Sequence, residues 1–450
     1  MANIVLTYAL IVALVTICLF PFLFVVRVGQ KDFFEPIYWA TAYFALLFIF
    51  RPIYDLTLGS EFLGNQPFDS ATGEAFNLGL LYAFLSFCVF LIGYYSSLGT
   101  RLAAALPFLP ATWHGYRVKI GTALLLALGL VAYAYLIEFF GGWSYYVNNK
   151  SETLTMAGQG YLLFGVSLIS VAFSLQLTFA FQSGKKSYVT LAVLLTILFV
   201  IGFFSGSKTA FFVPVLVFLI SFHYLKKVMR VRQFFGFLVL VFMLMPIFNL
   251  YRQHSDVIDL DAVREIQLAD ESIYQVFVRH GMSRFYGIDS LALIIRDTPR
   301  AMDFQYGSTV WPLFVAWVPR QVWENKPIIS FGREFADIYM PEYFAGSGTS
   351  ASPTLIGEGY LNWHLPGALF VALLSGITLR VIYFWLILRN LSAPSVFLYS
   401  QIFLYCFSFW EISIAGFLAE RIPPLIVLIV VITVAGGRRT SGPHTKGAVS

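Results

Sequence analysis

Two side chains near the end of a long polar segment are suited to acid–base chemistry. Glu358 lies between Gly357 and Gly359, and His364 follows it shortly before a long apolar run. Either group can take a proton from a hydroxyl. A lone histidine is more often structural, so these residues alone leave the catalytic and the structural interpretation open. The Gly-x-Ser-x-Gly sequence of many serine hydrolases does not occur in the chain.

Basic side chains in two other places could bind an anion such as pyrophosphate. Arg279 and Arg284 lie in a stretch with a helical pattern, and arginine forms bidentate hydrogen bonds with phosphate. Ordinary ion-paired or snorkelling arginines remain an alternative. Lys208 follows Gly206 and Ser207 in a short turn before a predicted helix, whose N-terminus attracts anions. This turn lacks the glycine spacing of a nucleotide-binding loop.

The same polar segment contains a tryptophan-rich stretch, residues 311–323. It is too short to span a bilayer, and its three tryptophans and two prolines suit a segment lying at the membrane interface. Both a plain interfacial anchor and a substrate clamp fit this pattern. The following residues 324–327 are predicted to turn the chain back into water.

The elements that must position these residues are membrane-spanning helices. The chain has 450 residues, of which 58% are hydrophobic and 12% charged, whereas a soluble protein carries about 25% charged residues. A water-soluble enzyme is therefore excluded. Nearly unbroken apolar runs such as 191–204 and 425–435 also exclude a barrel, whose strands alternate polar and apolar faces. The three cysteines, Cys18, Cys88 and Cys406, lie in apolar runs and suggest no disulfide framework or zinc site.

The apolar runs predict an all-α polytopic membrane protein with about eleven transmembrane helices. They lie near residues 4–26, 35–50, 76–98, 119–140, 160–182, 188–204, 210–225, 234–251, 366–388, 395–418 and 422–436. We divide the chain into an N-terminal bundle of about eight helices (1–251), a large loop with interfacial helices (252–366), and C-terminal helices with a basic tail (367–450). Lys and Arg concentrate in alternate short connections, which places those connections and the tail in the cytoplasm. The N-terminus and the large loop are then outside.

Three stretches of the chain resemble the Wzy-type oligosaccharide repeat-unit polymerases of bacteria. Residues 206–210 are similar to the family's Gly-Ser-Arg turn, with Lys208 in place of arginine. Residues 318–327 are similar to its Pro-Arg-x-x-Trp-x-x-Lys-Pro stretch, and residues 352–363 match its Gly-Glu-x-Tyr-x-Asn pattern before a late span. The large outer loop and the number of spans fit as well, so the likeness covers most of the chain.

The resemblance implies a glycosyltransferase of the bacterial inner membrane with a GT-C-like architecture, a periplasmic loop and a cytoplasmic C-terminus. Such an enzyme moves a growing glycan from an undecaprenyl pyrophosphate carrier to a sugar hydroxyl of an incoming lipid-linked unit. No acidic motif for a metal and a nucleotide sugar occurs, so we expect no metal and no cofactor. The implied partners are undecaprenyl-pyrophosphate-linked oligosaccharides, membrane lipids and a chain-length regulator protein, with no nucleic acid.

The resemblance also implies roles for individual residues. Glu358 is the first choice for the base that activates the acceptor hydroxyl, and His364 is the second. The residues expected to hold the pyrophosphate are Arg279, Arg284, Arg320 and Lys208. The residues expected to contact sugars are Tyr360, Asn362, His280 and Trp323. Lysine at position 208 departs from the family pattern and cannot bind phosphate bidentately.

Three other functions compete with a polymerase. An O-antigen ligase would share the donor and the large loop but would pass the glycan to lipid A–core. A transporter would place broken helices and charges at the bilayer midplane, whereas this chain concentrates its charge in one outer loop. A membrane O-acyltransferase would need a catalytic histidine within the spans, and His223 beside Lys226 and Lys227 is its only candidate.

Overall fold

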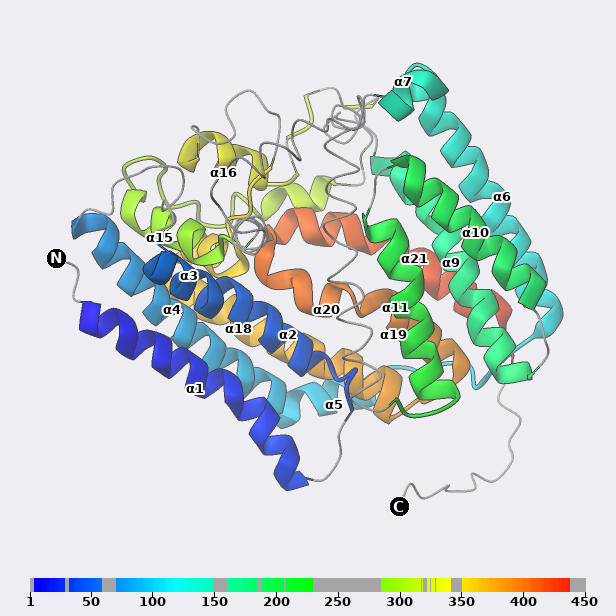
Figure 1. Ribbon diagram of the computed structural model, residues 1–450, viewed down its shortest axis with the longest axis horizontal. Helices are drawn as coiled ribbons and strands as arrows, with labels where there is room; N and C mark the ends of the chain where they lie inside the picture. The colour runs from blue at the N-terminus through cyan, green and yellow to red at the C-terminus, as the bar shows by residue number, and fades with distance from the viewer. Residues whose placement is uncertain are drawn as a thin grey trace, which may run out of the picture.

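The chain forms an almost entirely helical structure in those parts that the computed structural model describes. The described residues are 4–28, 32–58, 70–148, 160–184, 188–205, 208–229, 285–316, 318, 322–323, 325–327, 329–340 and 350–437. The first half contains α1 (Ile4–Val28), α2 (Pro36–Ala45), η1 (Leu46–Phe50), α3 (Arg51–Leu58), α4 (Ser70–Tyr95), α5 (Ser97–Ala105), β1 (Thr112–Trp113), α6 (Gly115–Phe139), α7 (Trp143–Asn148), α9 (Gly160–Ser183), α10 (Tyr188–Ser205) and α11 (Lys208–Leu225). The second half contains α15 (Gly287–Asp297), η2 (Trp311–Val315), α16 (Gly332–Tyr339), α18 (Leu355–Tyr383), η3 (Phe384–Leu388), α19 (Ala393–Ile402), α20 (Tyr405–Ser408), η4 (Phe409–Glu411), α21 (Ile414–Ala435) and β2 (Gly436–Gly437) (Figure 1).

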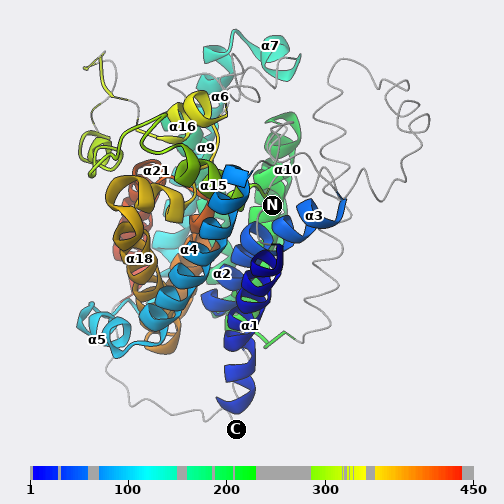
Figure 2. The same ribbon diagram turned by 90° about the vertical axis from the view of Figure 1, so that its left-hand side faces the viewer.

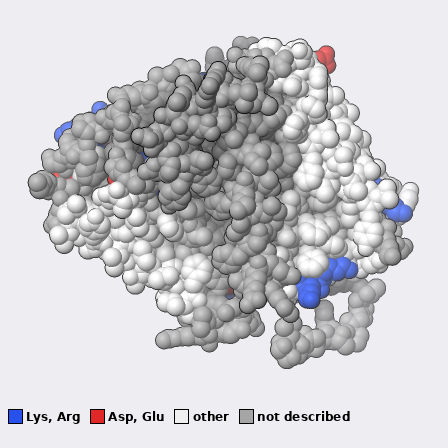
Figure 3. Space-filling model, viewed as in Figure 1, with Lys and Arg blue, Asp and Glu red and all other residues white. Residues whose placement is uncertain are grey.

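Seven of the described helical segments are long and apolar enough to cross a membrane. They are Ile4–Leu23, Pro36–Thr57, Thr72–Tyr95, Gly115–Phe139, Gly160–Ser183, Leu355–Leu388 and Ile414–Ala435. Two shorter apolar helices, Tyr188–Phe204 and Phe212–Leu225, accompany them. On the face shown in Figure 3, the described surface is mainly uncharged, with Lys and Arg at its margins. The prediction of a helical membrane protein is therefore confirmed.

The predicted number of eleven spans stays a prediction. The span predicted at 234–251 lies outside the described residues. The segment predicted as one span over 395–418 is not a continuous helix, because α19 ends at Ile402 and the chain turns at Phe403 and Leu404 before the short elements α20 and η4. Hydropathy detects the apolar run but is insensitive to such a break.

The described helices pack around two hydrophobic cores. One core joins α1, α2, α4, α15, α20 and much of α18, and the other joins α6, α9, α10, α11 and α19 with parts of α21. We call these the first and the second bundle. Within the first bundle α4 and α18 cross closely, since Gly376 lies against the backbone of Phe90, and Gly93 lies against the backbone of Leu373. Small residues allow this approach of two helix backbones in a membrane.

Replacing Gly376 by alanine is expected to lower the stability of the protein. The added Cβ would overlap the Phe90 carbonyl oxygen, which belongs to a helix backbone and cannot move aside. Overpacking of this kind costs about 1–3 kcal/mol. The measurement is thermal unfolding of the detergent-purified protein. Gly121→Ala is the matched control, because a Cβ on this α6 glycine meets only Leu175, at 3.5 Å; equal unfolding temperatures for the two variants would refute the close crossing.

Helix α18 is broken near its start. Trp363 (φ −143°, ψ 32°) and His364 (φ 56°, ψ −157°) are not helical. A Cβ on Gly359 would lie 2.9 Å from the Cα of Ala368, although these positions of a straight helix would be about 13 Å apart. Residues 355–362 therefore form a short helix that folds back on the long one, and we call it the folded-back helix. The continuous part begins close to residue 366, where the sequence predicted the start of this span.

One end of the bundle is covered by segments from the large loop. Helices α15 and α16 lie above the ends of α4 and α18 (Figure 2), and η2 packs on α21. Asp289 of α15 is fully buried and lies 3.0 Å from the guanidinium of Arg51, which also pairs with Asp55 at 3.1 Å. Burial raises the pKa of Asp289 to about 7, against the opposing effect of Arg51. We call this the covered end.

The opposite end of the bundle contains the connections between helices that are rich in Lys and Arg. Arg389, which follows η3, donates to the carbonyl oxygens of Ala103 and Leu106 at 2.7 and 2.8 Å. Strand β1 pairs antiparallel with β2, so the connection before α6 meets the end of α21. The described basic residues of these connections are Arg101, Arg117, Lys119, Lys226, Lys227 and Arg389. We call this the basic end.

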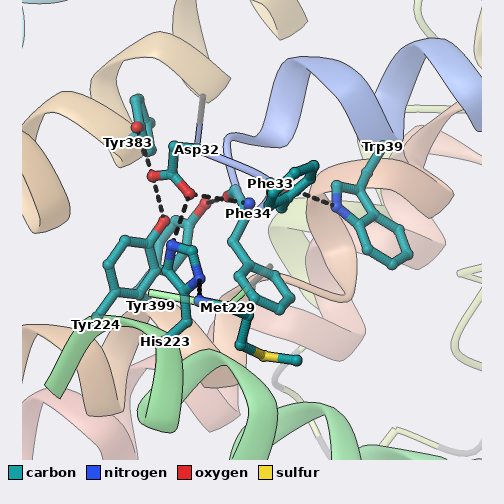
Figure 4. Close-up of polar contacts among 9 residues, drawn as sticks. All are labelled: Asp32, Phe33, Phe34, Trp39, His223, Tyr224, Met229, Tyr383 and Tyr399. Carbon is teal, nitrogen blue, oxygen red and sulfur yellow. Dashed lines mark hydrogen bonds and ion pairs between the residues drawn. The ribbon is translucent and has the colours of Figure 1, made fainter. Parts of the chain in front are cut away.

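A buried hydrogen-bond cluster at the basic end joins the two bundles (Figure 4). Asp32, in the turn between α1 and α2, accepts hydrogen bonds from Tyr224 of α11 at 2.6 Å and Tyr383 of α18 at 2.7 Å. Its other carboxylate oxygen accepts from the Phe34 amide at 3.0 Å and lies 3.4 Å from His223 Nε2. We call these residues the Asp32 cluster.

The charge state of the Asp32 cluster follows from its donors. The Met229 amide donates to His223 Nδ1 at 3.2 Å, so this nitrogen carries a lone pair and the proton is on Nε2, facing Asp32. Burial acts to raise the pKa of Asp32, but the hydrogen bonds from His223, Tyr224 and Tyr383 outweigh it and leave the pKa below its usual value. The cluster is thus an ionised carboxylate held by hydrogen bonds from His223, Tyr224 and Tyr383. His223 thus lies beside Asp32 at the basic end.

Candidate functional site

Glu358 lies in the folded-back helix at the covered end and is completely buried. Its Oε1 accepts a hydrogen bond from the Thr309 hydroxyl at 2.7 Å. Its Oε2 accepts from the backbone N–H of Ile414 at 2.6 Å. Ile414 is the first residue of α21, so the carboxylate also lies where the helix dipole favours negative charge. Two hydrogen bonds hold the carboxylate in place, and it has no contact with solvent.

Asn362, one helical turn after Glu358, completes the network. Its Nδ2 donates to the Thr309 hydroxyl at 2.8 Å and to the Glu358 carbonyl oxygen at 2.9 Å, and its Oδ1 accepts from the Gly307 amide at 2.7 Å. Because Thr309 Oγ1 accepts from Asn362, its own proton is directed at Glu358. The amide of Asn362 thereby orients the threonine that orients the carboxylate.

The residues before the folded-back helix explain why it begins where it does. Thr354 is its N-cap: the side chain accepts from the Gly357 amide at 3.0 Å, and the backbone has a φ of 62°. Ser352 holds this turn by donating to the Glu411 carbonyl oxygen and accepting from the Thr354 amide at 3.1 Å. Glu411, near the start of α21, in turn accepts a hydrogen bond from Tyr43 of α2.

His364 lies at the break in α18 and is exposed, unlike Glu358. Its φ of 56° is in the left-handed region that non-glycine residues seldom occupy. Its ring stacks on Phe304 with centroids 3.6 Å apart, and Phe304 lies 5.8 Å from the Tyr360 ring. Tyr82 of α4 lies 5.7 Å from Tyr360. These four rings form an aromatic group beside the Asn362–Thr309–Glu358 network.

The structure brings together some of the predicted site residues. Glu358, Tyr360, Asn362 and His364 share one short segment at the covered end. Trp323 is described and is 40% exposed. Lys208 is the first residue of α11, as the predicted helix start required. Four predicted residues lie outside the described part of the chain: Arg279, His280, Arg284 and Arg320.

Lys326, in the stretch that resembles the polymerase motif, has a structural role. It is buried, and its ammonium group donates to the carbonyl oxygens of Ala316 at 2.6 Å and Val318 at 2.7 Å. These carbonyls follow η2, so Lys326 fastens the chain that leaves the tryptophan-rich stretch. The lysine of this motif fixes the loop in place.

A large cavity separates the first bundle from the second. Its volume is about 1070 Å³, and its walls come from α6, α7, α9, α10, α11, α18, α19, α20 and α21. Leu355 and Ile414, which flank the Glu358 network, line it together with Arg421. Most lining side chains are apolar. Among the described residues, no group of three or more His, Cys, Asp and Glu could hold a metal ion.

Sequence reasoning missed two residues of this region. Thr309 belongs to a short Gly-Ser-Thr-Val stretch without a recognisable motif, and only the folded structure places it on Glu358. Arg421 lies within α21 and in the cavity wall, where only the folded structure places it. The sequence signal that could have identified Arg421 is its position directly before Ile422 and Pro423, at the start of an apolar run.

The fold and the buried polar network define a polytopic α-helical membrane protein with its candidate site at one end of the bundle. A family model described as "Domain of unknown function (DUF8712)" matches residues 132–385, more than half of the chain, and the protein belongs to this family. The matched segment begins in α6 and ends in η3, so it includes Glu358, Asn362 and Thr309. No curated protein and no solved structure matches the chain.

Proposed function

We propose that the protein is a glycosyltransferase that polymerises undecaprenyl-pyrophosphate-linked oligosaccharide repeat units. The observation that carries the proposal is the Asn362–Thr309–Glu358 network. It fixes a carboxylate at the covered end, within the segment that resembles the Gly-Glu-x-Tyr-x-Asn pattern of the Wzy-type polymerases. The aromatic group beside it offers ring faces on which a sugar can stack. The count of eleven spans and the GT-C-like architecture belong to this proposal.

The orientation follows from charge. The basic end gathers lysines and arginines of alternate connections, and such residues favour the cytoplasm. The covered end is then periplasmic, and the membrane is the bacterial inner membrane, where the lipid-linked units are presented. The C-terminal tail leaves from the basic end, next to β1, and is cytoplasmic.

The proposed reaction is one displacement at the anomeric carbon of the donor. The acceptor hydroxyl oxygen forms the new bond to this carbon, its proton passes to Glu358, and the bond to the carrier pyrophosphate breaks with its electron pair on the leaving oxygen. Since Glu358 is completely buried, the proposed reaction requires the protein to open at this point and admit the acceptor. Arg279, Arg284, Arg320 and Lys208 are the proposed contacts of the pyrophosphate, and Tyr360, Asn362, His280 and Trp323 those of the sugars.

Two alternatives share parts of this site. An O-antigen ligase would use the same donor and differ only in its acceptor, lipid A–core. A transporter would need charged groups near the middle of the membrane. The Glu358 network and the Asp32 cluster lie at opposite ends of the bundle, and Arg421 lies within α21. The position of the Glu358 network at one end is the feature that favours transfer chemistry over transport.

The deciding experiment uses the purified protein in nanodiscs with undecaprenyl-pyrophosphate-linked repeat unit as the sole glycan, EDTA present and nucleotide sugar absent. We expect a ladder of carrier-linked oligomers. Transfer that occurs only after addition of lipid A–core would identify a ligase instead. With verified substrate and folded protein, failure of both reactions would reject glycosyl transfer.

A further inference from the structure

The cavity between the two bundles has features of a ligand site. Its walls are formed largely by aliphatic and aromatic side chains of membrane helices, so its interior suits a hydrocarbon chain rather than water. It extends along α18 from Leu355, beside the Glu358 network, to Trp385 near the basic end. A chain lying in it would therefore run along the membrane normal, with one end at the covered end of the protein.

Polar groups without partners interrupt this apolar wall. Within the part of the chain that the structure describes, the buried atoms Arg421 Nε and Gln401 Nε2 have no hydrogen-bond partner, and both residues line the cavity. Both atoms belong to donor groups. A buried donor left unpaired is destabilising, and an anionic oxygen atom in the cavity would satisfy either one.

Arg421 supplies the positive charge of the site. Its guanidinium lies 4.0 Å from the centre of the Tyr405 ring, also in the cavity wall, and this ring holds it in place. Its ion pair with Glu420 is long, at 3.5 Å, and the Glu420 side chain is 67% exposed, so this pair contributes little. The guanidinium remains able to bind a phosphate group.

We infer that this cavity binds the carrier lipid: its hydrocarbon chain lies between the bundles and its phosphate group is bound by Arg421. The chemical class is a polyprenyl phosphate or pyrophosphate, an amphiphile with one long chain and an anionic head. The assignment of this lipid rests on the proposed function, which requires such a carrier.

The location of Arg421 indicates which of the two lipid-linked substrates the cavity holds. Arg421 lies seven residues after Ile414, or about 10 Å along the helix, and the Ile414 amide is bonded to Glu358. In the donor the anomeric carbon is bonded directly to the pyrophosphate, so base and phosphate must be close. In the acceptor the reacting hydroxyl is separated from its pyrophosphate by the sugars of the unit. The cavity is thus the donor site.

The test is lipid binding measured without turnover. The purified full-length protein in phosphatidylcholine nanodiscs is titrated with undecaprenyl phosphate, and separately with undecaprenol and phosphatidylglycerol. We expect Arg421→Gln to weaken undecaprenyl phosphate binding by about tenfold or more, as for the loss of one charged hydrogen bond, and to leave undecaprenol binding unchanged. Ser170→Phe, which fills the cavity from α9, is expected to weaken both.

Arg300→Gln is the matched control, because this exposed arginine follows α15 at the covered end and does not line the cavity. Equal affinity of wild type and Arg421→Gln for undecaprenyl phosphate would overturn the inference, and so would displacement of this lipid by equimolar phosphatidylglycerol. Arg421-dependent binding without any oligomer ladder would retain the lipid site and reject the polymerase. A normal ladder together with lipid binding that is independent of Arg421 would retain the polymerase and reject the lipid site.

Discussion

Glu358→Gln is expected to reduce polymerisation by a factor between about 10² and 10⁴, the contribution of a positioned acid–base group. Glutamine has nearly the same shape but cannot take the proton of the acceptor hydroxyl. Its NH₂ group must also face either the Thr309 hydroxyl or the Ile414 amide, both of which donate to the carboxylate. We therefore expect an additional loss of stability of about 1–3 kcal/mol. The measurement is the initial rate of ladder formation, normalised to folded protein.

Thr309→Val separates the chemical role of Glu358 from its structural role. This variant removes one hydrogen bond to the carboxylate and keeps the carboxylate itself, so it is expected to retain more activity than Glu358→Gln at comparable stability. If both variants lose activity only in proportion to unfolding, Glu358 serves to cap α21 and is not the base. Full activity of Glu358→Gln together with loss of activity in His364→Ala would assign the base to His364.

Arg51→Ala is expected to be the most destabilising single change, at about 3–5 kcal/mol. Arg51 is buried and pairs with Asp289 and Asp55. Its removal leaves Asp289, which is fully buried in α15, without a cation. Thermal unfolding in detergent measures the effect. Arg333→Ala in the exposed part of α16 is the control, and it should remain within about 0.5 kcal/mol of the wild type.

The same variant should show a distinct pH dependence. Burial already raises the pKa of Asp289 to about 7, and loss of Arg51 raises it further. An acid whose pKa is higher in the folded state binds its proton more tightly there, so its contribution to stability falls as the pH rises. Arg51→Ala should therefore lose more stability relative to wild type at pH 8 than at pH 5.5. A pH-independent difference would show that the ion pair is not the cause.

Hydrophobic patterning predicted most of the described helices, because a membrane helix must bury its backbone groups within an apolar run. It could not predict where such a run breaks. The span was predicted over 366–388 with residues 355–365 in the loop, yet residues 355–362 form a helix that folds back on this span, where Gly359 contacts Gly367. Glycine is needed at both positions because the two backbones approach closely there, and this approach is visible only in the folded structure. The break at Phe403 and Leu404 was not predicted, because these two residues are as apolar as their neighbours.

The candidate site was predictable where its residues are consecutive. Glu358, Asn362 and His364 were identified because they share a single stretch, and the structure keeps the first two in one network. Thr309 and Arg421 were not identified, since their relation to Glu358 arises through contacts between distant parts of the chain. The interpretation of the tryptophan-rich stretch as an interfacial segment fits the exposed Trp311, which is 61% exposed.

The Asp32 cluster has a consequence for the order in which the protein assembles. A ribosome releases Asp32 early, whereas Tyr224 of α11 follows after about half of the 450 residues and Tyr383 of α18 only near the end of synthesis. Until then the carboxylate needs water, which is present at the membrane surface and absent from the hydrocarbon interior. Because Asp32 lies in the turn between α1 and α2, these helices can insert into the membrane before its partners have been synthesised. The two bundles can then be joined as a last step, when Tyr383 replaces that water.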